Sequence, residues 1–360
     1  MIFNRIFNNY IVKFANYTQK EKIMGKQVHL VLLTLLMVVS LGFTSCENDV
    51  DLNSEYKEIT IVYGLLSQSQ DRQYIKITKA FQTEGNVYVA AKDPANSVYD
   101  PKDLEVSLDE YKNDNYISSI YLDSILITNK DTGDFYSPNE IIYVTPVGYK
   151  LKQNNEYRLT IKNKVTGNII TSKTTLVHDF SISRPLALQK YANFAGNYNQ
   201  RVEWTPAENG VLNQFAIRFY YTDVPQSGST SSHYVDMVFP TKRADKNSSM
   251  PMVIEFPGYS FYQNLKTKIP LPESGMKRYS DSLYYMFDVA DDDFSIYMDI
   301  NGPSNSVVQE RPTYSNITNG VGLFASRYSK IRYFSGLGVK SLQELYNGQY
   351  TYQLGFVDRP

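Results

Sequence analysis

Polar and apolar residues alternate with a period of two in several segments, and this pattern constrains the fold more than any other feature of the chain. Residues 74–79, 104–109 and 157–162 each place apolar side chains on one face and polar side chains on the other. Such alternation is typical of half-buried β-strands. Turn-forming residues separate these segments, at 131–133, 154–155 and 166–168. The first part of the chain, residues 56–178, is therefore predicted to be an antiparallel β-sandwich of the immunoglobulin or fibronectin type.

The composition favours strands in the remainder as well. The chain contains 31 tyrosines and 18 phenylalanines but a single tryptophan, Trp204. Aromatic side chains suit the half-buried face of a sheet. Trp204 precedes the aromatic run 215–221, as expected for the core of a second β-rich domain over residues 179–360.

Two short helices and a final strand are expected in this second domain. Residues 291–299 alternate like a strand, but their three leading aspartates favour a short helix. Residues 341–348 resemble a second helix, with Ser341 as its cap. Residues 350–356 are predicted to form the last strand.

The N-terminal region resembles a secretion signal that ends at the chain's single cysteine. Residues 24–45 contain Lys26, an apolar run over 31–39, and small residues just before Cys46. The segment 43–46 resembles a bacterial lipobox, which predicts cleavage before Cys46 and lipid attachment to its thiol. An ordinary signal peptide with an incidental cysteine is the alternative. Residues 1–23 fit no signal layout and are interpreted as an upstream start assigned in error.

An acidic tether follows the cysteine over residues 46–55. Glu47, Asp49 and Asp51 resemble the signal that sends Bacteroidetes lipoproteins to the cell surface. The alternative is a solvated linker whose charge keeps it away from the anionic membrane. The expected location is the outer membrane, with the lipid anchor in the membrane and the chain facing the cell exterior.

The leader with Cys46, the segment 62–66 and the segment 309–324 together resemble a group of Bacteroidetes outer-membrane lipoproteins of unknown function. The resemblance implies a β-rich fold and frequent association with TonB-dependent transporters. It implies no catalytic residue.

Motifs for catalysis, metal binding and nucleic-acid binding are weak in this sequence. With Cys46 lipidated, the mature chain retains two histidines, His178 and His233, and it has no Gly-x-Ser-x-Gly motif. No metal site, cofactor or catalytic residue is predicted. The net charge of −1 argues against nucleic-acid binding. Gly320 and Gly322 lack the rest of a phosphate-binding loop and are expected to mark a bulge or a close backbone approach.

Aromatic residues are the best candidates for ligand contact, because they offer large rigid surfaces with a polar end. The candidates are Tyr259, Phe261 and Tyr262, in a predicted exposed loop, and the pair Tyr284 and Tyr285. The expected ligand is a glycan or a peptide. Ser124 and Ser282 each follow an aspartate and precede an apolar residue, a pattern that resembles a Bacteroidetes O-glycosylation signal.

Three functions remain open from the sequence. The first is a non-enzymatic surface lipoprotein that assists ligand capture or uptake by a TonB-dependent transporter. The second is a structural or adhesion lipoprotein associated with fimbriae. The third is a glycoside hydrolase, which would require a pair of carboxylates in a cleft.

Overall fold

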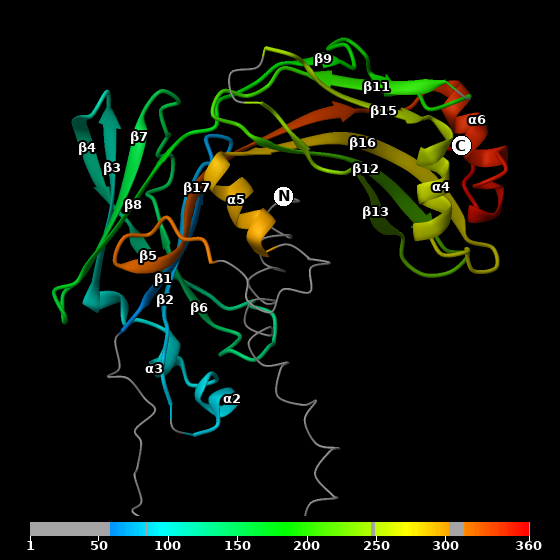
Figure 1. The fold of residues 1–360 in the computed structure, drawn as a ribbon. Coiled ribbons are helices and arrows are strands. Elements are labelled where there is room, and N and C mark those ends of the chain that lie inside the picture. Colours follow the sequence, from blue (N-terminus) through cyan, green and yellow to red (C-terminus); the bar gives the residue numbers. More distant parts are fainter. Residues whose placement is uncertain (1–57, 84, 197, 246–248, 302–312, 360) are drawn as a thin grey trace, which may run out of the picture.

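Strands dominate the computed structural model, which describes residues 58–83, 85–196, 198–245, 249–301 and 313–359 (Figure 1). The predicted mainly β fold with antiparallel sheets and few short helices is confirmed. The predicted lipidation residue Cys46 and the predicted export-signal residues Glu47, Asp49 and Asp51 lie outside the described residues. No helix within the described ranges is long and apolar enough to cross a bilayer.

One large sheet runs through both halves of the chain. Its strands follow the order β13-β12-β16-β17-β1-β2-β6-β5, and β14 pairs with β12 outside this path. In chain order they are β1 (Thr60–Leu66), β2 (Tyr74–Lys79), β5 (Asp123–Ile127), β6 (Glu140–Val144), β12 (Leu212–Val224), β13 (Ser231–Val238), β14 (Lys242–Arg243), β16 (Lys277–Ala290) and β17 (Gly320–Phe334).

Three smaller sheets accompany the large one. The first has the order β4-β3-β7-β8, the second β15-β11-β9, and the third pairs β10 with β18. Their strands are β3 (Leu104–Lys112), β4 (Asn115–Tyr121), β7 (Glu156–Asn163), β8 (Ile169–Thr175), β9 (Ile182–Arg184), β10 (Tyr191–Ala192), β11 (Asn199–Trp204), β15 (Met252–Pro257) and β18 (Gly336–Leu337).

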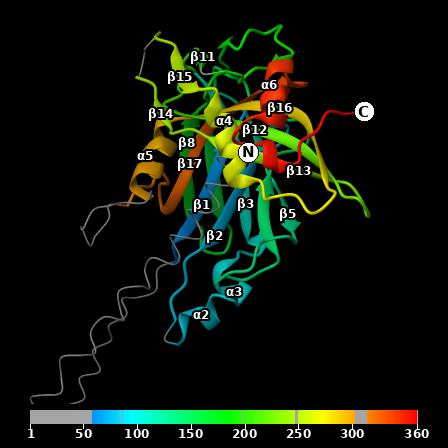
Figure 2. The ribbon, with the colours of Figure 1, turned by 90° about the vertical axis from the view of Figure 1, so that its right-hand side faces the viewer.

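The helices within the described residues are short. They are α2 (Val87–Ala90), α3 (Pro94–Ser97), α4 (Tyr259–Lys268), α5 (Asp292–Asn301) and α6 (Val339–Asn347), with 3-10 turns at η2 (Pro101–Asp103) and η3 (Tyr352–Leu354). In Figure 2, α4 and α6 lie toward the viewer, and α2 and α3 lie at the lower end of the molecule.

Two hydrophobic cores define two lobes. In the N-terminal lobe, the sheet of β3, β4, β7 and β8 packs on β1, β2 and β6 through residues such as Leu108, Ile161 and Phe324. In the C-terminal lobe, one face of β12 and β16 packs against β11, β15 and α4 around Trp204, which lies 5.2 Å from Phe287 between ring centroids. Trp204 is thus a core residue, as its position in the sequence indicates.

Strand β17 belongs to both lobes. Its first half pairs in parallel with β1, from Thr60 opposite Gly320 to Leu66 opposite Ser326. Its second half pairs with β16 in an antiparallel register. The N-terminal lobe therefore includes a strand from the second predicted region, in addition to residues 56–178.

The close approach expected at the two glycines occurs between β17 and β1. Gly322 has a φ of +122°, and a Cβ atom there would lie 2.0 Å from the carbonyl oxygen of Val62. Only glycine fits this backbone without displacement of β1.

The predicted short helices over 291–299 and 341–348 are present as α5 and α6. Ser341 lies inside α6 rather than at its cap, and its hydroxyl accepts a hydrogen bond from the backbone of Phe194. The predicted strand over 350–356 is wrong, because this segment forms η3 and a single bridge between Phe356 and Arg278. The buried Arg278 guanidinium donates to the carbonyl of Leu354, and this contact holds the segment against the sheet.

Candidate functional site

The predicted exposed loop around Tyr259 is instead the helix α4. Phe261 and Tyr262 are each 1% exposed. Phe261 stacks on Phe194 with 4.2 Å between ring centroids, and the Tyr262 hydroxyl donates to the carbonyl of Ser341. Only Tyr259 keeps an exposed ring, so Phe261 and Tyr262 are core residues and offer no surface to a ligand.

Tyr284 and Tyr285 lie on opposite faces of β16, as neighbours in a strand must. Tyr285 is 5% exposed and contacts Phe215 and Phe334 in the core of the C-terminal lobe. Burial raises its pKa above the usual value for tyrosine. Tyr284 lies on the other, open face of the sheet and is half-buried, so this residue alone of the pair can contact a ligand.

Tyr284 is one member of a line of four tyrosines that crosses four neighbouring strands. We call it the tyrosine row, and its members in strand order are Tyr234 of β13, Tyr220 of β12, Tyr284 of β16 and Tyr333 of β17. Successive ring centroids lie 5.8, 5.0 and 5.5 Å apart. The end residues Tyr234 and Tyr333 are 47% and 51% exposed.

A paired arginine lies on the same face and contacts the row. The Arg218 guanidinium donates through Nε and Nη2 to both carboxylate oxygens of Asp236, at 2.7 and 2.8 Å. Its central carbon lies 4.0 Å from the centre of the Tyr234 ring. The hydrogen bonds that Arg218 donates to Asp236 raise the pKa of Arg218, so the guanidinium stays charged. The pair holds Tyr234 in place without adding net charge to the surface.

Apolar side chains extend the same face next to the row. Ala216, Met286 and Ile331 are cross-strand neighbours on β12, β16 and β17. Ile331 and Val238 are large hydrophobic residues with about half of their surface exposed. Ala216 and Met286 are themselves buried, so the exposed apolar surface next to the row consists of Ile331 and Val238. Exposed aromatic and aliphatic side chains that lie together mark an interaction surface.

Further along the same face of the sheet, where it is covered, lies a buried arginine. Arg327 of β17 pairs across the sheet with Ala290, which belongs to the small core formed with Phe294 and Tyr297 of α5. Arg327 is 3% exposed, and its Nε and Nη1 atoms have no hydrogen-bond partner among the described residues. Burial lowers its pKa, and the negative charge of Asp288 acts in the opposite direction.

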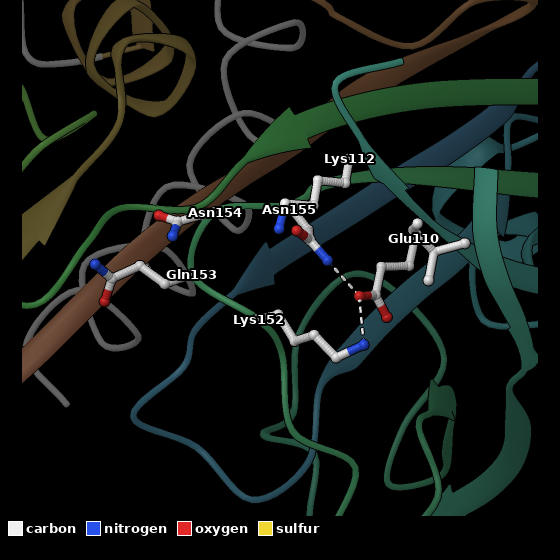
Figure 3. A pocket seen from close by; sticks show the side chains of 7 residues that line it. Glu110, Lys112, Lys152, Gln153, Asn154 and Asn155 are labelled. Carbon is white, nitrogen blue, oxygen red and sulfur yellow. Dashed lines mark hydrogen bonds and ion pairs between the residues drawn. The ribbon is translucent and has the colours of Figure 1, made fainter. Parts of the chain in front are cut away.

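A small polar pocket lies on the N-terminal lobe, between β3, β4 and the turn before β7 (Figure 3). Its volume is about 280 Å³, and the buried Glu110 carboxylate lies at its base. Lys152 donates to Glu110 at 2.7 Å, and the Asn155 amide donates to the same oxygen. The pocket contains a single carboxylate, which is already paired, whereas a glycoside hydrolase needs two.

A buried carboxyl group joins the two lobes next to α5. Asp291 Oδ1 accepts the backbone N–H of Phe294, at the start of α5. Its Oδ2 accepts the N–H of Ser326 at 2.6 Å and the hydroxyl of Thr174 at 3.1 Å. Burial raises the pKa of Asp291 to about 7, although these hydrogen bonds act to lower it. The group connects β8, β17 and α5.

Neither histidine forms a catalytic relay. His178 is buried at the start of the linker, and its Nδ1 lies 3.1 Å from a carboxylate oxygen of Glu208. His233 Nε2 lies 2.8 Å from the Ser231 hydroxyl and 3.8 Å from the Asp223 carboxylate. Both partners meet the same ring nitrogen, whereas a relay requires the serine and the carboxylate on opposite nitrogens. Within the described ranges, no group of three or more potential ligands could hold a metal ion.

The two candidate glycosylation serines differ in exposure. Ser124 is exposed on the edge strand β5, whereas Ser282 is half-buried within β16. Modification at either serine remains a prediction.

No family model matches the chain, and no curated protein matches it significantly. The site therefore depends on geometry alone. The sequence did not predict Tyr220, Tyr234, Tyr333 or Arg327 as site residues. They become neighbours of Tyr284 only through the pairing of strands, which the sequence does not reveal. The period-two alternation along each residue's own strand is the only sequence signal that could have indicated a face shared with Tyr284.

Proposed function

We propose that this chain is a non-enzymatic, surface-exposed outer-membrane lipoprotein that captures a ligand for uptake by a TonB-dependent transporter. The observation that carries the proposal is the exposed tyrosine row on the open face of the large sheet. Tyrosines and a desolvated arginine beside them are the side chains most enriched at binding hot spots. The signal sequence that ends at Cys46 and the resemblance of the chain to transporter-associated lipoproteins supply the location.

The adhesion alternative has one observation in its favour. Strand β4 is the edge of its sheet, and Tyr116, Ile117 and Tyr121 are exposed along it. An exposed sheet edge can add a strand from another chain. A fimbrial role would use this edge, whereas ligand capture would use the tyrosine row.

Lipidation is tested by the substitution Cys46→Ala. We expect the variant to lose incorporation of radiolabelled palmitate and to leave the membrane fraction, because no other thiol is present in the chain. The wild-type protein, purified from detergent-solubilised outer membranes, should bring a TonB-dependent transporter with it. Unchanged membrane retention of Cys46→Ala would refute the anchor, and co-purification of fimbrial subunits would favour the adhesion alternative.

A further inference from the structure

Strand β4 is the edge of its sheet, and its sequence carries neither charge nor proline. Within the described ranges, β3 is the only strand that pairs with β4 (Figure 1). Edge strands usually carry charged side chains or proline, or lie under another segment. The sequence of β4 has none of these residues, and Tyr116, Ile117 and Tyr121 are between 47% and 64% exposed. This edge is therefore accessible to another strand.

The edge strands β13 and β8 both have contacts that β4 lacks. The Lys268 side chain donates to the backbone carbonyl of Asp236 on β13. Thr171 of β8 and Thr318 exchange two backbone hydrogen bonds, so the segment before β17 covers part of that edge. In the part of the chain that the structure describes, no residue beyond β3 makes such a contact with β4. Of these three edges, β4 is the one best suited to add a strand.

Two residues near the end of β4 direct their backbone groups away from β3. The N–H of Leu122, the residue after β4, donates to the carbonyl of Val106. Successive residues of a strand direct their N–H and C=O groups to opposite sides. The backbone groups of Tyr121 and Ser119 therefore point outward, where a further strand would lie.

The start of β4 supplies a third outward position. Asn115 pairs with Lys112 across a two-residue turn, in which Asn113 and Asp114 both have positive φ values. In such a hairpin the pair that closes the turn is hydrogen-bonded, so the next residue, Tyr116, directs its N–H and C=O outward.

A β-bulge places these three outward residues on one face of the sheet. The register of β4 on β3 shifts at this point, so that Ile117 and Ser118 together occupy one position opposite Glu110. The outward residues then pair with alternate residues of β3, which share a face. These pairs are Tyr116–Tyr111, Ser119–Asp109 and Tyr121–Ser107.

The sequence of residues 116–121, Tyr-Ile-Ser-Ser-Ile-Tyr, reads the same in both directions. In a regular strand this palindrome could not pair with itself around a twofold axis, because its two central serines point to opposite faces. The bulge removes the conflict, since Ile117 and Ser118 share one position and Ser119 becomes the centre. An antiparallel second copy then places Tyr121 opposite Tyr116 of the partner subunit, on both sides of the axis.

We propose that two copies of this chain pair through β4, in antiparallel orientation around a twofold axis at Ser119. The three outward positions exchange about six backbone hydrogen bonds with the partner subunit. The two tyrosine pairs and the central serine pair add cross-strand contacts of the kind that stabilise antiparallel sheets. No charged side chain of β4 opposes a like charge. The dimer goes beyond the proposed function and leaves the tyrosine row free, because the row lies on another sheet.

The register is tested by Ser119→Cys in the full-length lipoprotein in its own membrane. A hydrogen-bonded antiparallel pair has Cα atoms about 5.5 Å apart, within the ~4.4–6.8 Å that a disulfide spans. After mild oxidation we expect a disulfide-linked dimer on non-reducing electrophoresis. The control is Ser232→Cys, at an exposed serine of the edge strand β13, and the wild-type protein with Cys46 alone gives the background. Absence of the dimer in Ser119→Cys, or equal dimer in both variants, would overturn the proposal.

Ser119→Pro separates dimer formation from folding. Proline is tolerated on an edge strand where its missing N–H faces outward, so the monomer should keep the circular dichroism spectrum of the wild type. At the axis the same change removes hydrogen bonds to the partner subunit. Ser119→Ala is the matched control, because it loses the hydroxyl but keeps the N–H.

Analytical ultracentrifugation of the detergent-solubilised proteins gives the mass of each species. We expect the wild type and Ser119→Ala to sediment as dimers and Ser119→Pro to sediment as a monomer. A monomeric wild type, or a dimeric Ser119→Pro, would overturn the proposal. Purification of a single copy with a fimbrial subunit bound to it would also overturn it, whereas ligand capture by the tyrosine row would stand in each case.

Discussion

At the scale of single residues, Asp291 has the environment most sensitive to pH. Its Oδ2 atom receives both the Ser326 amide and the Thr174 hydroxyl. Thr174 also lies 3.1 Å from the carbonyl of Thr175, to which it can donate. A protonated Oδ2 could therefore donate to Thr174, which would turn its own proton toward Thr175. The neutral carboxyl thus loses no partner, and this agrees with a pKa raised to about 7 by burial.

This residue should make stability depend on pH in a defined window. The pKa of an aspartate in an unfolded chain is about 3.9. A pKa raised on folding gives stability that is complete below about pH 4 and is lost as the pH rises to about 7. Relative to Asp291→Asn, which cannot titrate, the wild-type protein should lose about 2–3 kcal/mol of unfolding free energy between pH 5 and pH 8, at 1.36 kcal/mol per pH unit.

Urea unfolding of both proteins at pH 5 and pH 8 provides the measurement. The same substitution at the exposed Asp131 is the control, and it should behave alike at the two pH values. A wild-type-to-Asn difference that does not change with pH would show that Asp291 is ionised throughout.

At the scale of secondary-structure elements, the local patterns predicted strands well and pairings poorly. The alternation over 104–109 and 157–162 corresponds to β3 and β7, which are neighbours in one sheet. The aromatic residues after Gly258 were misassigned to a loop, because helix α4 starts without a side-chain cap that the sequence could reveal. Tyr284 could be predicted as a contact residue, but its partners in the row come from strands that lie 49 to 64 residues away along the chain (333 − 284 = 49 and 284 − 220 = 64).

Gly322 gives a test of the pairing between β17 and β1. Gly322→Ala should destabilise the protein by about 3–5 kcal/mol, because the new methyl group would collide with the Val62 carbonyl and the backbone φ is unfavourable for alanine. Gly133→Ala is the control, since a Cβ there has no atom within 4 Å, and its effect should stay within about 0.5 kcal/mol. Similar urea midpoints for the two variants would contradict the close approach.

At the scale of the whole molecule, the predicted tether would determine how far the folded lobes lie from the membrane. Residues 46–55 can extend to at most ~35 Å, so the N-terminal lobe is expected to stay near the membrane that holds the lipid. The side of the membrane on which it lies was predicted from Glu47, Asp49 and Asp51 alone, and these residues lie outside the described part of the chain.

Replacement of Glu47, Asp49 and Asp51 by alanine should leave the protein folded but retain it on the periplasmic side. Folding should survive because exposed charges contribute little to stability. Protease treatment of intact cells should digest the wild-type protein and spare the triple variant. Equal digestion of both would mean that these carboxylates only solvate the tether.

The parallel pairing of β1 with β17 also fixes the order in which this molecule can be completed. Thr60 and its partner Gly320 are separated by 320 − 60 = 260 residues, and β1 is the first described strand of the chain. Because synthesis runs from the N-terminus, β1 is among the first of the described strands to appear and β17 among the last. Such distant contacts form slowly. One edge of β1 therefore remains unpaired until β17 has been synthesised, and the N-terminal lobe is completed by a strand that is made late.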